Sequence, residues 1–363
     1  MSNRLERLRA SLSAHALDAA LVSHPANRFY LSGYTAEDHG PEESAGVLLV
    51  AAESAVLCTS PNNVEWARSE APAFEVVAWE RPWIKTVADR LGLLGCRRVG
   101  FEDRAISFAV MRGLIEAIDG SAELVPLENA VTELRAMKDG DEIARIARAI
   151  RLTDEVFTGI AAELEVGLTE REIAWRIERA FRDRGADGAA FPTIVASGPH
   201  AARPHHGASE RSIQAGEPII IDMGARLDGY NADLTRTVWI GEPEDRLRAV
   251  YNAVYDAQAA ALTMIRADIS GADADKAARS VLESAGFGEH IVHSLGHGLG
   301  IQVHEAPSAS PTSEQVLRAG EVLTVEPGLY FPEWGGVRIE DVVVVEGQGC
   351  RNLTTAPKAR LPE

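Results

Sequence analysis

The first third of the chain alternates short apolar runs with stretches that have a helical spacing of apolar residues. The apolar runs predict strands, at residues 18–22, 46–51, 55–58, 74–78, 98–101 and 123–125. Helices are expected between them, for example at residues 107–118 and at 25–31, where a proline suits the first turn. A helical stripe of Leu5, Leu8 and Leu12 precedes the first strand. The alternation predicts an α/β domain.

A polar stretch separates this part of the chain from the rest. It follows Pro126 and covers residues 128–133, so we expect two domains, 1–131 and 132–363. A chain of 363 residues fits that division, because a domain typically has about 150 residues. The first domain carries no motif with an evident chemical role, which directs the search for function to the second.

Helical patterns open the second domain and recur in its middle. One face of a long helix is marked by Ile143, Ile146, Ile150, Phe157 and Ile160. A second helix begins at Thr169, where Glu172 completes a capping box, and ends before Gly185. Two more helices are predicted near residues 243–265 and 272–285. We interpret these helices as scaffold.

A β-hairpin is predicted at residues 219–237, because the Asp-Gly pair at 228–229 separates two strand-like runs. A two-residue loop there would pair Asp222 with Thr235 and place Asp233 on the same face as Asp222. Diagonal positions lie about 7 to 8 Å apart, near enough for two carboxylates to converge on one cation. Aspartate is disfavoured inside strands, so the pair needs a reason. The alternative explanation is that both aspartates lie on a face of the hairpin that is exposed to solvent.

A second strand–turn–strand unit near the C-terminus also carries two acids. One strand ends at Glu326, and another, at residues 337–345, places Arg338 and Glu340 on one face and Ile339 on the other. The intervening sequence, PGLYFPEWGG, predicts a turn. Each of the two units therefore presents two carboxylates.

Histidines gather before and between these units. His200, His205 and His206 follow a predicted strand at residues 191–197, in a loop where a site and a structural role are equally open. His297 lies between glycines, which allow a close approach of the backbone to a ligand. The flanked His297 is the stronger candidate ligand.

Composition limits the possible partners and location. A formal net charge of −18 argues against a nucleic-acid or anionic-membrane surface, because both need a basic patch. Cys58, Cys96 and Cys350 are odd in number and far apart, which favours reduced thiols over disulfides. The N-terminus lacks the apolar core of a signal peptide, and no apolar run reaches the roughly 18 residues of a membrane span. We therefore expect a soluble, cytoplasmic protein.

Five residues of the second domain have the chemistry of metal ligands: Asp222, Asp233, His297, Glu326 and Glu340. Four buried carboxylates would repel one another unless cations neutralised them. Two divalent ions about 3.5 to 4 Å apart would do so and would lower the pKa of a bridging water towards about 7. The set therefore predicts a two-metal centre that holds a hydroxide against a carbonyl group.

Five segments resemble, in order and spacing, the pita-bread metallopeptidases that include Xaa-Pro dipeptidase (prolidase) and aminopeptidase P. They are Pro204-His205, IDMGARLDGYNADLTRT, HSLGHGLGIQVHE, VEPGLY and GGVRIED. The first domain is similar to the creatinase-type domain that precedes the catalytic half in this family. The resemblance implies an α/β N-terminal domain followed by an α+β pita-bread catalytic domain. It also implies hydrolysis of the peptide bond before proline by a metal-bridging hydroxide.

The resemblance implies a role for each matching ligand. Asp222 would bind one metal ion, Asp233 and Glu340 would bridge both ions, and His297 and Glu326 would bind the other. Glu326 would also act as the general base or acid that serves the bridging water.

Other residues match positions that bind substrate or support the ligands. The matching histidines that are not ligands would bind substrate and stabilise the oxyanion: His205, His293 and His304. Arg338 would orient the carboxylates. Phe191 replaces a tyrosine that some relatives have near the metals, so a hydroxyl contribution there is in doubt. His200 and His206 match no position of known role.

The resemblance leaves several alternatives open. Oxygen-rich ligation favours Mn²⁺, with Co²⁺ and Zn²⁺ as alternatives. A homodimer is usual in the family, and the expected substrate is a small peptide with proline second. The compact size favours a dipeptidase over an aminopeptidase. Non-peptide hydrolases and lyases of the same fold are a further alternative, as is a peptide-binding module, although such modules tend to have lost the metal ligands.

Overall fold

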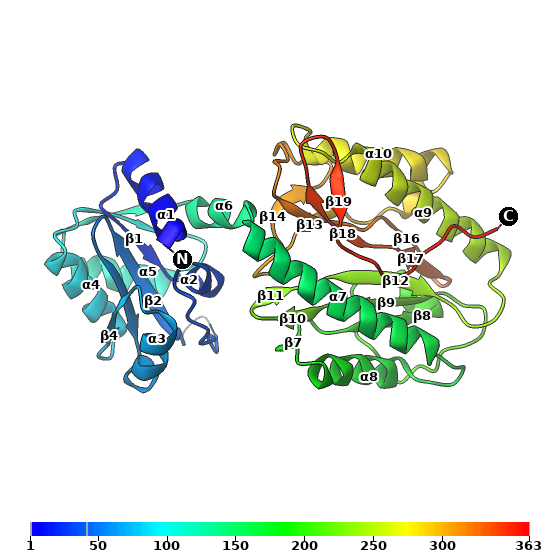
Figure 1. Cartoon of the computed structure of the whole chain (residues 1–363), viewed down its shortest axis with the longest axis horizontal. Coiled ribbons are helices and arrows are strands. Elements are labelled where there is room, and N and C mark those ends of the chain that lie inside the picture. Colours follow the sequence, from blue (N-terminus) through cyan, green and yellow to red (C-terminus); the bar gives the residue numbers. More distant parts are fainter. Residues whose placement is uncertain (1, 41–42, 363) are drawn as a thin grey trace. The chain divides into compact units, whose positions relative to one another are not determined.

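The computed structural model describes residues 2–40 and 43–362, which form two compact units (Figure 1). The first unit extends to Arg135 and the second begins at Ala136. Helix α6 (Ala130–Ala136) covers most of the polar stretch that marks the expected domain boundary, so that stretch is helical. Among the described residues, no helix combines the length and the apolar character that a membrane crossing requires.

The first unit is built on a mixed sheet whose described strands have the order β4-β3-β2-β1-β5-β6. The strands are β1 (Ala19–Val22), β2 (Gly46–Ala51), β3 (Ala55–Thr59), β4 (Glu75–Ala78), β5 (Arg98–Phe101) and β6 (Glu123–Pro126). The helices before α6 are α1 (Ser2–Ala14), α2 (Pro25–Ser32), α3 (Val64–Glu70), α4 (Trp83–Leu93) and α5 (Phe108–Ile118). Strand β1 pairs antiparallel with β2 and parallel with β5. The predicted α/β domain is confirmed.

Apolar side chains of the helices and the sheet form the core of the first unit. The stripe of Leu5, Leu8 and Leu12 on α1 is buried, as the sequence predicts. Leu21 on β1 and Leu49 on β2 are fully buried in a cluster with apolar side chains of α4 and α5. The N-terminal segment is therefore an integral helix of this unit.

The second unit contains two halves of similar design, each an antiparallel sheet packed against a pair of helices. In one half, α7 (Gly140–Ala162) and α8 (Glu170–Asp183) pack on β8 (Ile194–Ser197), β9 (Ile219–Met223) and β12 (Leu234–Val238). In the other half, α9 (Asp245–Met264) and α10 (Gly271–Ser284) pack on β13 (Gly296–Gly298), β14 (Glu305–Ala309), β15 (Val322–Val325), β18 (Asp341–Val345) and β19 (Cys350–Asn352). This α+β arrangement agrees with the expected class of the catalytic domain.

Local capping fixes where the long helices begin. The predicted box at α8 is confirmed: the Thr169 hydroxyl accepts from the Glu172 amide at 3.1 Å, and the Glu172 carboxylate accepts from the Thr169 amide at 2.8 Å. Asp139 and Glu142 form the same box at the start of α7. Such caps satisfy amides that have no partner within the helix.

The predicted hairpin has the predicted register. Asp222 lies opposite Thr235 in the β9–β12 ladder. Beyond it, β10 (Ala225–Leu227) pairs with β11 (Tyr230–Asn231) in the same register. Asp228 and Gly229 have φ values of 51° and 76°, as a two-residue turn of this kind requires. The turn therefore places the two aspartates on the face that the sequence indicates.

Two predictions about the C-terminal strands are wrong in part. The expected turn at residues 327–336 contains β16 (Gly328–Phe331), which pairs with β17 (Gly335–Arg338) as a hairpin. The expected single strand at 337–345 is divided into β17 and β18 by Ile339 and Glu340. The reason is tertiary: the Glu340 amide donates to the carbonyl of Thr235 in β12 at 3.0 Å instead of continuing its own ladder.

The strand expected at residues 191–197 is shorter than predicted. It begins only at Ile194. Pro192 has no amide hydrogen to donate to a ladder, which accounts for the late start.

Replacement of Gly229 by alanine is expected to destabilise the protein by about 1 kcal/mol, because a Cβ is unfavourable at positive φ. The matched control is Gly159→Ala in α7, where an added Cβ meets nothing within 4 Å. That change is expected to stabilise by roughly 0.5–1 kcal/mol. Calorimetric melting of both variants checks the pair, and an unchanged melting temperature for Gly229→Ala would contradict the importance of the turn.

Candidate metal centre

A cavity of about 980 Å³ in the second unit collects the residues that the sequence indicates. Its lining includes all five predicted ligands, Asp222, Asp233, His297, Glu326 and Glu340. It also includes the other predicted site residues, His205, His293, His304 and Arg338. Residues separated by more than a hundred positions in the sequence therefore meet in one place.

Three carboxylates form the centre of this cavity. Oxygen atoms of Asp222, Asp233 and Glu340 all lie within 4.8 Å of one another. Asp222 belongs to β9, Asp233 directly precedes β12, and Glu340 lies between β17 and β18. The Thr235 hydroxyl donates to Oε2 of Glu340 at 2.9 Å, which links the two halves beside the acids.

His297 and Glu326 adjoin the three carboxylates. The His297 Nε2 atom lies 3.2 Å from Oε1 of Glu326 and 3.8 Å from Oδ2 of Asp233. Its Nδ1 atom donates to the Gly298 carbonyl at 3.1 Å, which turns Nε2 towards the acids. Gly296 and Gly298 permit this placement, because an added Cβ would lie 2.1 Å from the Thr324 carbonyl oxygen and 2.2 Å from that of Ala306. The flanking glycines thus serve close backbone packing.

Burial and mutual repulsion shape the protonation of the acids. Burial raises the pKa of Asp233 and of Glu340 well above their ordinary values, and neighbouring carboxylates raise them further. Burial also raises the pKa of Asp222, against the opposing charge of Arg338. Glu326 differs: burial opposes its ionisation, but the hydrogen bond from His297 and the charges of His297, His293 and Arg338 together outweigh it and lower its pKa to about 2. The same interaction raises the pKa of His297 despite its burial.

The chemistry of the donors fits divalent metal ions. Among the residues that the structure describes, Oδ1 of Asp222 and Oε1 of Glu340 are buried without a hydrogen-bond partner. An unpaired buried oxygen is costly, and a cation is the partner that would satisfy it. Four carboxylates and one imidazole suit hard to borderline divalent ions. The five residues are thus a candidate metal centre.

A chain of hydrogen bonds supports one side of the acids. Arg338 donates from Nη2 to Oδ2 of Asp222 and from Nη1 to the Tyr330 hydroxyl, both at 2.7 Å. Tyr330 in turn lies 2.8 Å from Nε2 of His293, whose Nδ1 donates to the Ser294 carbonyl at 2.8 Å. Burial lowers the pKa of His293, so the neutral ring accepts from the Tyr330 hydroxyl. Arg338 thus donates a hydrogen bond to one of the candidate ligands.

Sequence reasoning missed Tyr330. It lies on β16, inside the segment interpreted as a turn. Had that segment been interpreted as a strand, Tyr330 and Gly328, two residues apart, would have been placed on the same face. Burial raises the pKa of its hydroxyl to about 12, so the group stays protonated and able to donate.

Two further histidines approach from other loops. The His304 ring meets that of His297 edge-on, with centroids 4.3 Å apart. Burial and the neighbouring His297 lower the pKa of His304. His205 and Phe191 both line the cavity. Phe191 contributes an aromatic wall without a hydroxyl.

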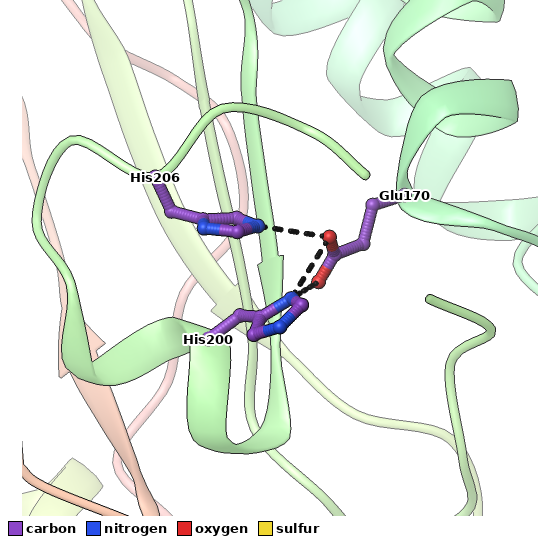
Figure 2. Close-up of side chains that lie close together, drawn as sticks. All are labelled: Glu170, His200 and His206. Carbon is purple, nitrogen blue, oxygen red and sulfur yellow. Dashed lines mark hydrogen bonds and ion pairs between the residues drawn. The ribbon is translucent and has the colours of Figure 1, made fainter. Parts of the chain in front are cut away.

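The loop histidines without a predicted role, His200 and His206, form a separate cluster around Glu170 (Figure 2). Glu170 is the first residue of α8 and is completely buried. Sequence reasoning missed this acid, because it stands beside the Thr169 cap and looks like an ordinary first-turn glutamate. The three histidines within one loop were the sequence feature that could have prompted a search for this acid.

Comparison with known proteins places the chain in a family. Residues 144–347 match the model of "Metallopeptidase family M24", and residues 4–137 match "Creatinase/Prolidase N-terminal domain". The chain belongs to metallopeptidase family M24. An Xaa-Pro dipeptidase of Pyrococcus furiosus is 31% identical over 99% of this chain and 100% of its own length.

Solved structures of M24 relatives share the whole fold. An Xaa-Pro dipeptidase from Bacillus anthracis has a TM-score of 0.93 and 36% identity, and the match covers 99% of this chain and 98% of that chain. An X-Pro aminopeptidase from Thermotoga maritima has a TM-score of 0.88 and 35% identity, with 96% and 99% covered. The expected pita-bread fold is confirmed. Membership in this metallopeptidase family implies divalent metal ions, for which the three central carboxylates are candidate ligands.

Metal binding is expected to release protons and to stabilise the protein more at higher pH. Asp233 and Glu340 hold protons above their ordinary pKa values of 3.8 and 4.5 in the metal-free protein, and a metal ion must displace those protons. Because the unfolded chain loses these protons first, their contribution to stability is full below pH 3.8 and declines as the pH rises through the raised values. The gain in melting temperature on adding Mn²⁺ should therefore be larger at pH 8 than at pH 5. Calorimetric titration in two buffers of different ionisation enthalpy measures the released protons, and equal heats would contradict the expectation.

Replacement of Asp233 by asparagine is expected to lower both metal content and activity. Loss of a residue that hydrogen-bonds to a metal ligand already lowers metal affinity or activity about 10- to 100-fold. Loss of the central carboxylate itself should therefore lower them more than about 100-fold. Asp228→Asn is the matched control, because Asp228 lies in the exposed turn of the same hairpin. Elemental analysis and rate measurements compare the two variants. A metal-replete, active Asp233→Asn protein would show that this carboxylate is not a ligand.

Proposed function

We propose that this M24 chain is a divalent-metal-dependent Xaa-Pro dipeptidase, which hydrolyses the bond before proline in a dipeptide. The observation that carries the proposal is the cavity in which four carboxylates and one imidazole converge. Two oxygens of these carboxylates, Oδ1 of Asp222 and Oε1 of Glu340, have no hydrogen-bond partner among the described residues. Intact ligands argue against a peptide-binding module, since such modules tend to have lost them. The Xaa-Pro dipeptidases among the relatives support the choice of substrate.

The proposed ligand set is the one that the sequence indicates. Asp222 would bind one ion, Asp233 and Glu340 both ions, and His297 and Glu326 the other. The closeness of Asp222, Asp233 and Glu340 within 4.8 Å supports a shared centre, and the 3.2 Å contact between His297 and Glu326 supports a common second ion. When bound, such a pair of ions acts as a Lewis acid on a carbonyl and lowers the pKa of water.

The residues of the chain would then handle orientation and protons. Glu326 is ionised in the metal-free protein, because its pKa is lowered to about 2. We assign to this carboxylate the transfer of a proton from water to the leaving amine. Arg338 holds Asp222 in place through the 2.7 Å hydrogen bond and keeps that carboxylate aligned.

The histidines of the cavity would contact the substrate. His205, His293 and His304 come from three separate loops and line the same space. Preorganised N–H donors stabilise negative charge that develops on a carbonyl oxygen, and they do so best where water is excluded. His293 donates from Nδ1 to Ser294 and accepts at Nε2 from Tyr330, so it would offer the substrate a ring of fixed orientation, and His205 and His304 would supply the N–H donors.

Finer points belong to the same proposal. Mn²⁺ is the proposed ion, because four of the five ligands offer oxygen. A cytoplasmic location is supported by the free cysteines Cys58, Cys96 and Cys350. A homodimer rests on the family resemblance alone. An aminopeptidase that accepts longer peptides is the second candidate, since the Thermotoga maritima relative is named for that activity.

The decisive experiment compares two substrates with Mn²⁺-loaded protein. One is an Xaa-Pro dipeptide and the other is the same sequence extended by one residue, with an Xaa-Ala dipeptide as the control for proline specificity. We expect cleavage of the dipeptide at a rate at least about tenfold above that of the longer peptide and of the control, because the site would select a free proline carboxylate.

Other outcomes would change the assignment. Efficient cleavage of the longer peptide would favour an aminopeptidase. If none of the three peptides is cut although metal is bound, the substrate is not a prolyl peptide.

A further inference from the structure

Glu170 is a buried anion outside the candidate metal centre, held by four separate residues. Its Oε1 atom accepts from the amide and hydroxyl of Ser197 at 2.9 and 2.7 Å. Its Oε2 atom accepts from the amide and hydroxyl of Ser209 at 3.1 and 2.6 Å. Figure 2 shows the rings of His200 and His206 converging on the same carboxylate, each with a nitrogen 3.0 Å from an oxygen.

Hydrogen bonds to the protein account for both oxygens of Glu170. Each oxygen accepts one amide and one hydroxyl and also has a histidine nitrogen at 3.0 Å, and Nδ1 of His200 lies 3.2 Å from Oε2 as well. These donors are enough to occupy the roughly four lone-pair sites of the carboxylate. Burial opposes ionisation, but the hydrogen bonds from Ser209 and Ser197 outweigh it and lower the pKa of Glu170 to about 2. The carboxylate is thus ionised and satisfied without a cation, unlike Asp222 and Glu340, which keep open oxygens.

The partners of Glu170 bracket one segment of the chain. Ser197 ends β8 and Ser209 lies where the chain returns to α8, with the Ser209 carbonyl accepting from the Arg171 amide at 3.0 Å. Glu170 therefore ties both ends and the middle of residues 197–209. Within this segment lies His205, which lines the cavity of the metal centre.

The opposite side of the segment contacts β17, in the half that contributes Glu340. An added Cβ at Gly336 of β17 would lie 2.3 Å from the Ala201 carbonyl oxygen, so the two backbones touch. Arg338 donates to the Pro204 carbonyl at 3.4 Å as well as to Asp222 at 2.7 Å. The segment is thus held between Glu170 on one side and the strand that orients a candidate ligand on the other.

We propose that Glu170 is a positioning residue: with His200 and His206 it fixes residues 197–209 so that His205 faces the metal centre. The inference rests on the proposed function, because the contact between His205 and the substrate is what gives the segment its role. His206 also lines the cavity, whereas His200 does not and acts only through the network.

Replacement of Glu170 by glutamine tests the proposal with little change in volume. The amide keeps one acceptor but turns an NH₂ group towards donors, so the segment loses part of its anchor. We expect kcat/KM on the Xaa-Pro dipeptide to fall on the order of tenfold to hundredfold, mainly in kcat, since small misplacements of a contacting group have effects of this size. Metal content should stay as in the wild type, because the segment carries no proposed ligand. Hydrogen exchange in residues 198–208 should become faster.

A double-mutant cycle separates positioning from general destabilisation. If Glu170 acts through His205, adding Glu170→Gln to His205→Ala should lower kcat/KM by no more than about twofold further. Multiplicative effects would overturn the proposal. Glu172→Gln is the matched control, since it removes a charge from the same helix turn without touching the segment. Its activity should be that of the wild type.

His200 offers a second test that does not depend on the stability of the Glu170 variant. In His200→Asn, the side-chain amide nitrogen can replace Nδ1 as a donor to Glu170, whereas His200→Leu removes the donor. We expect near wild-type kcat for asparagine and a several-fold loss for leucine. Equal activity of the two variants would overturn the proposal.

Metal analysis distinguishes the competing explanation of the cluster. An additional Zn²⁺ or Mn²⁺ equivalent that binds the wild type and is lost in Glu170→Gln would make the cluster a metal site and overturn the positioning role. Wild-type protein that cleaves no prolyl dipeptide would instead refute the proposed function. Wild-type cleavage with an unimpaired Glu170→Gln variant would refute only the present inference.

Discussion

Mutual repulsion among four carboxylates gathered in one cavity is the constraint on which the second unit depends. Asp222, Asp233, Glu326 and Glu340 share a cavity in which Arg338 pairs with Asp222 and His297 lies beside Glu326. These two groups do not complete the hydrogen bonding, since two carboxylate oxygens lack partners among the described residues. Such an arrangement is costly unless divalent ions complete it. Binding of metal and stability of the fold are therefore coupled in this unit.

The fold meets that constraint by joining two similar halves along their backbones. The β9–β12 hairpin contributes two aspartates, and the second half contributes His297, Glu326 and Glu340. The halves are bonded where Thr235 meets Glu340, through both the backbone and the side chain. Glycines at the contact positions let backbones approach to distances that a Cβ would forbid. The precision of the centre thus comes from strand register and close backbone packing.

Two groups of buried acids in this chain illustrate how the partners of a carboxylate indicate its role. Glu170 has serine, amide and histidine donors on both oxygens, which makes it a structural anion. Asp222 and Glu340 each keep one buried oxygen without a donor. Both clusters contain ligand-type side chains at short distances, so proximity alone does not separate them. Counting donors against lone pairs does.

The sequence alone determined much of this protein. Apolar periodicity located the strands of the first unit and the long helices, because these elements follow local patterns of burial. The Asp-Gly turn fixed the register of Asp222 against Thr235, since a two-residue loop leaves one pairing. Motif spacing then identified the four acids and one imidazole as a set and indicated the family.

Tertiary structure decided what depends on partners distant in the chain. The β16–β17 hairpin was hidden by its glycines and prolines, which indicate a turn, whereas Gly335 and Gly336 serve close contact with the backbone of Gly198 and Ala201. The break at Glu340 exists because its amide bonds to Thr235 in the other half. Tyr330 and Glu170 acquired their roles only from groups that fold beside them. Local sequence sets the elements, whereas hydrogen-bond partners from remote segments decide which buried polar groups remain open to a ligand.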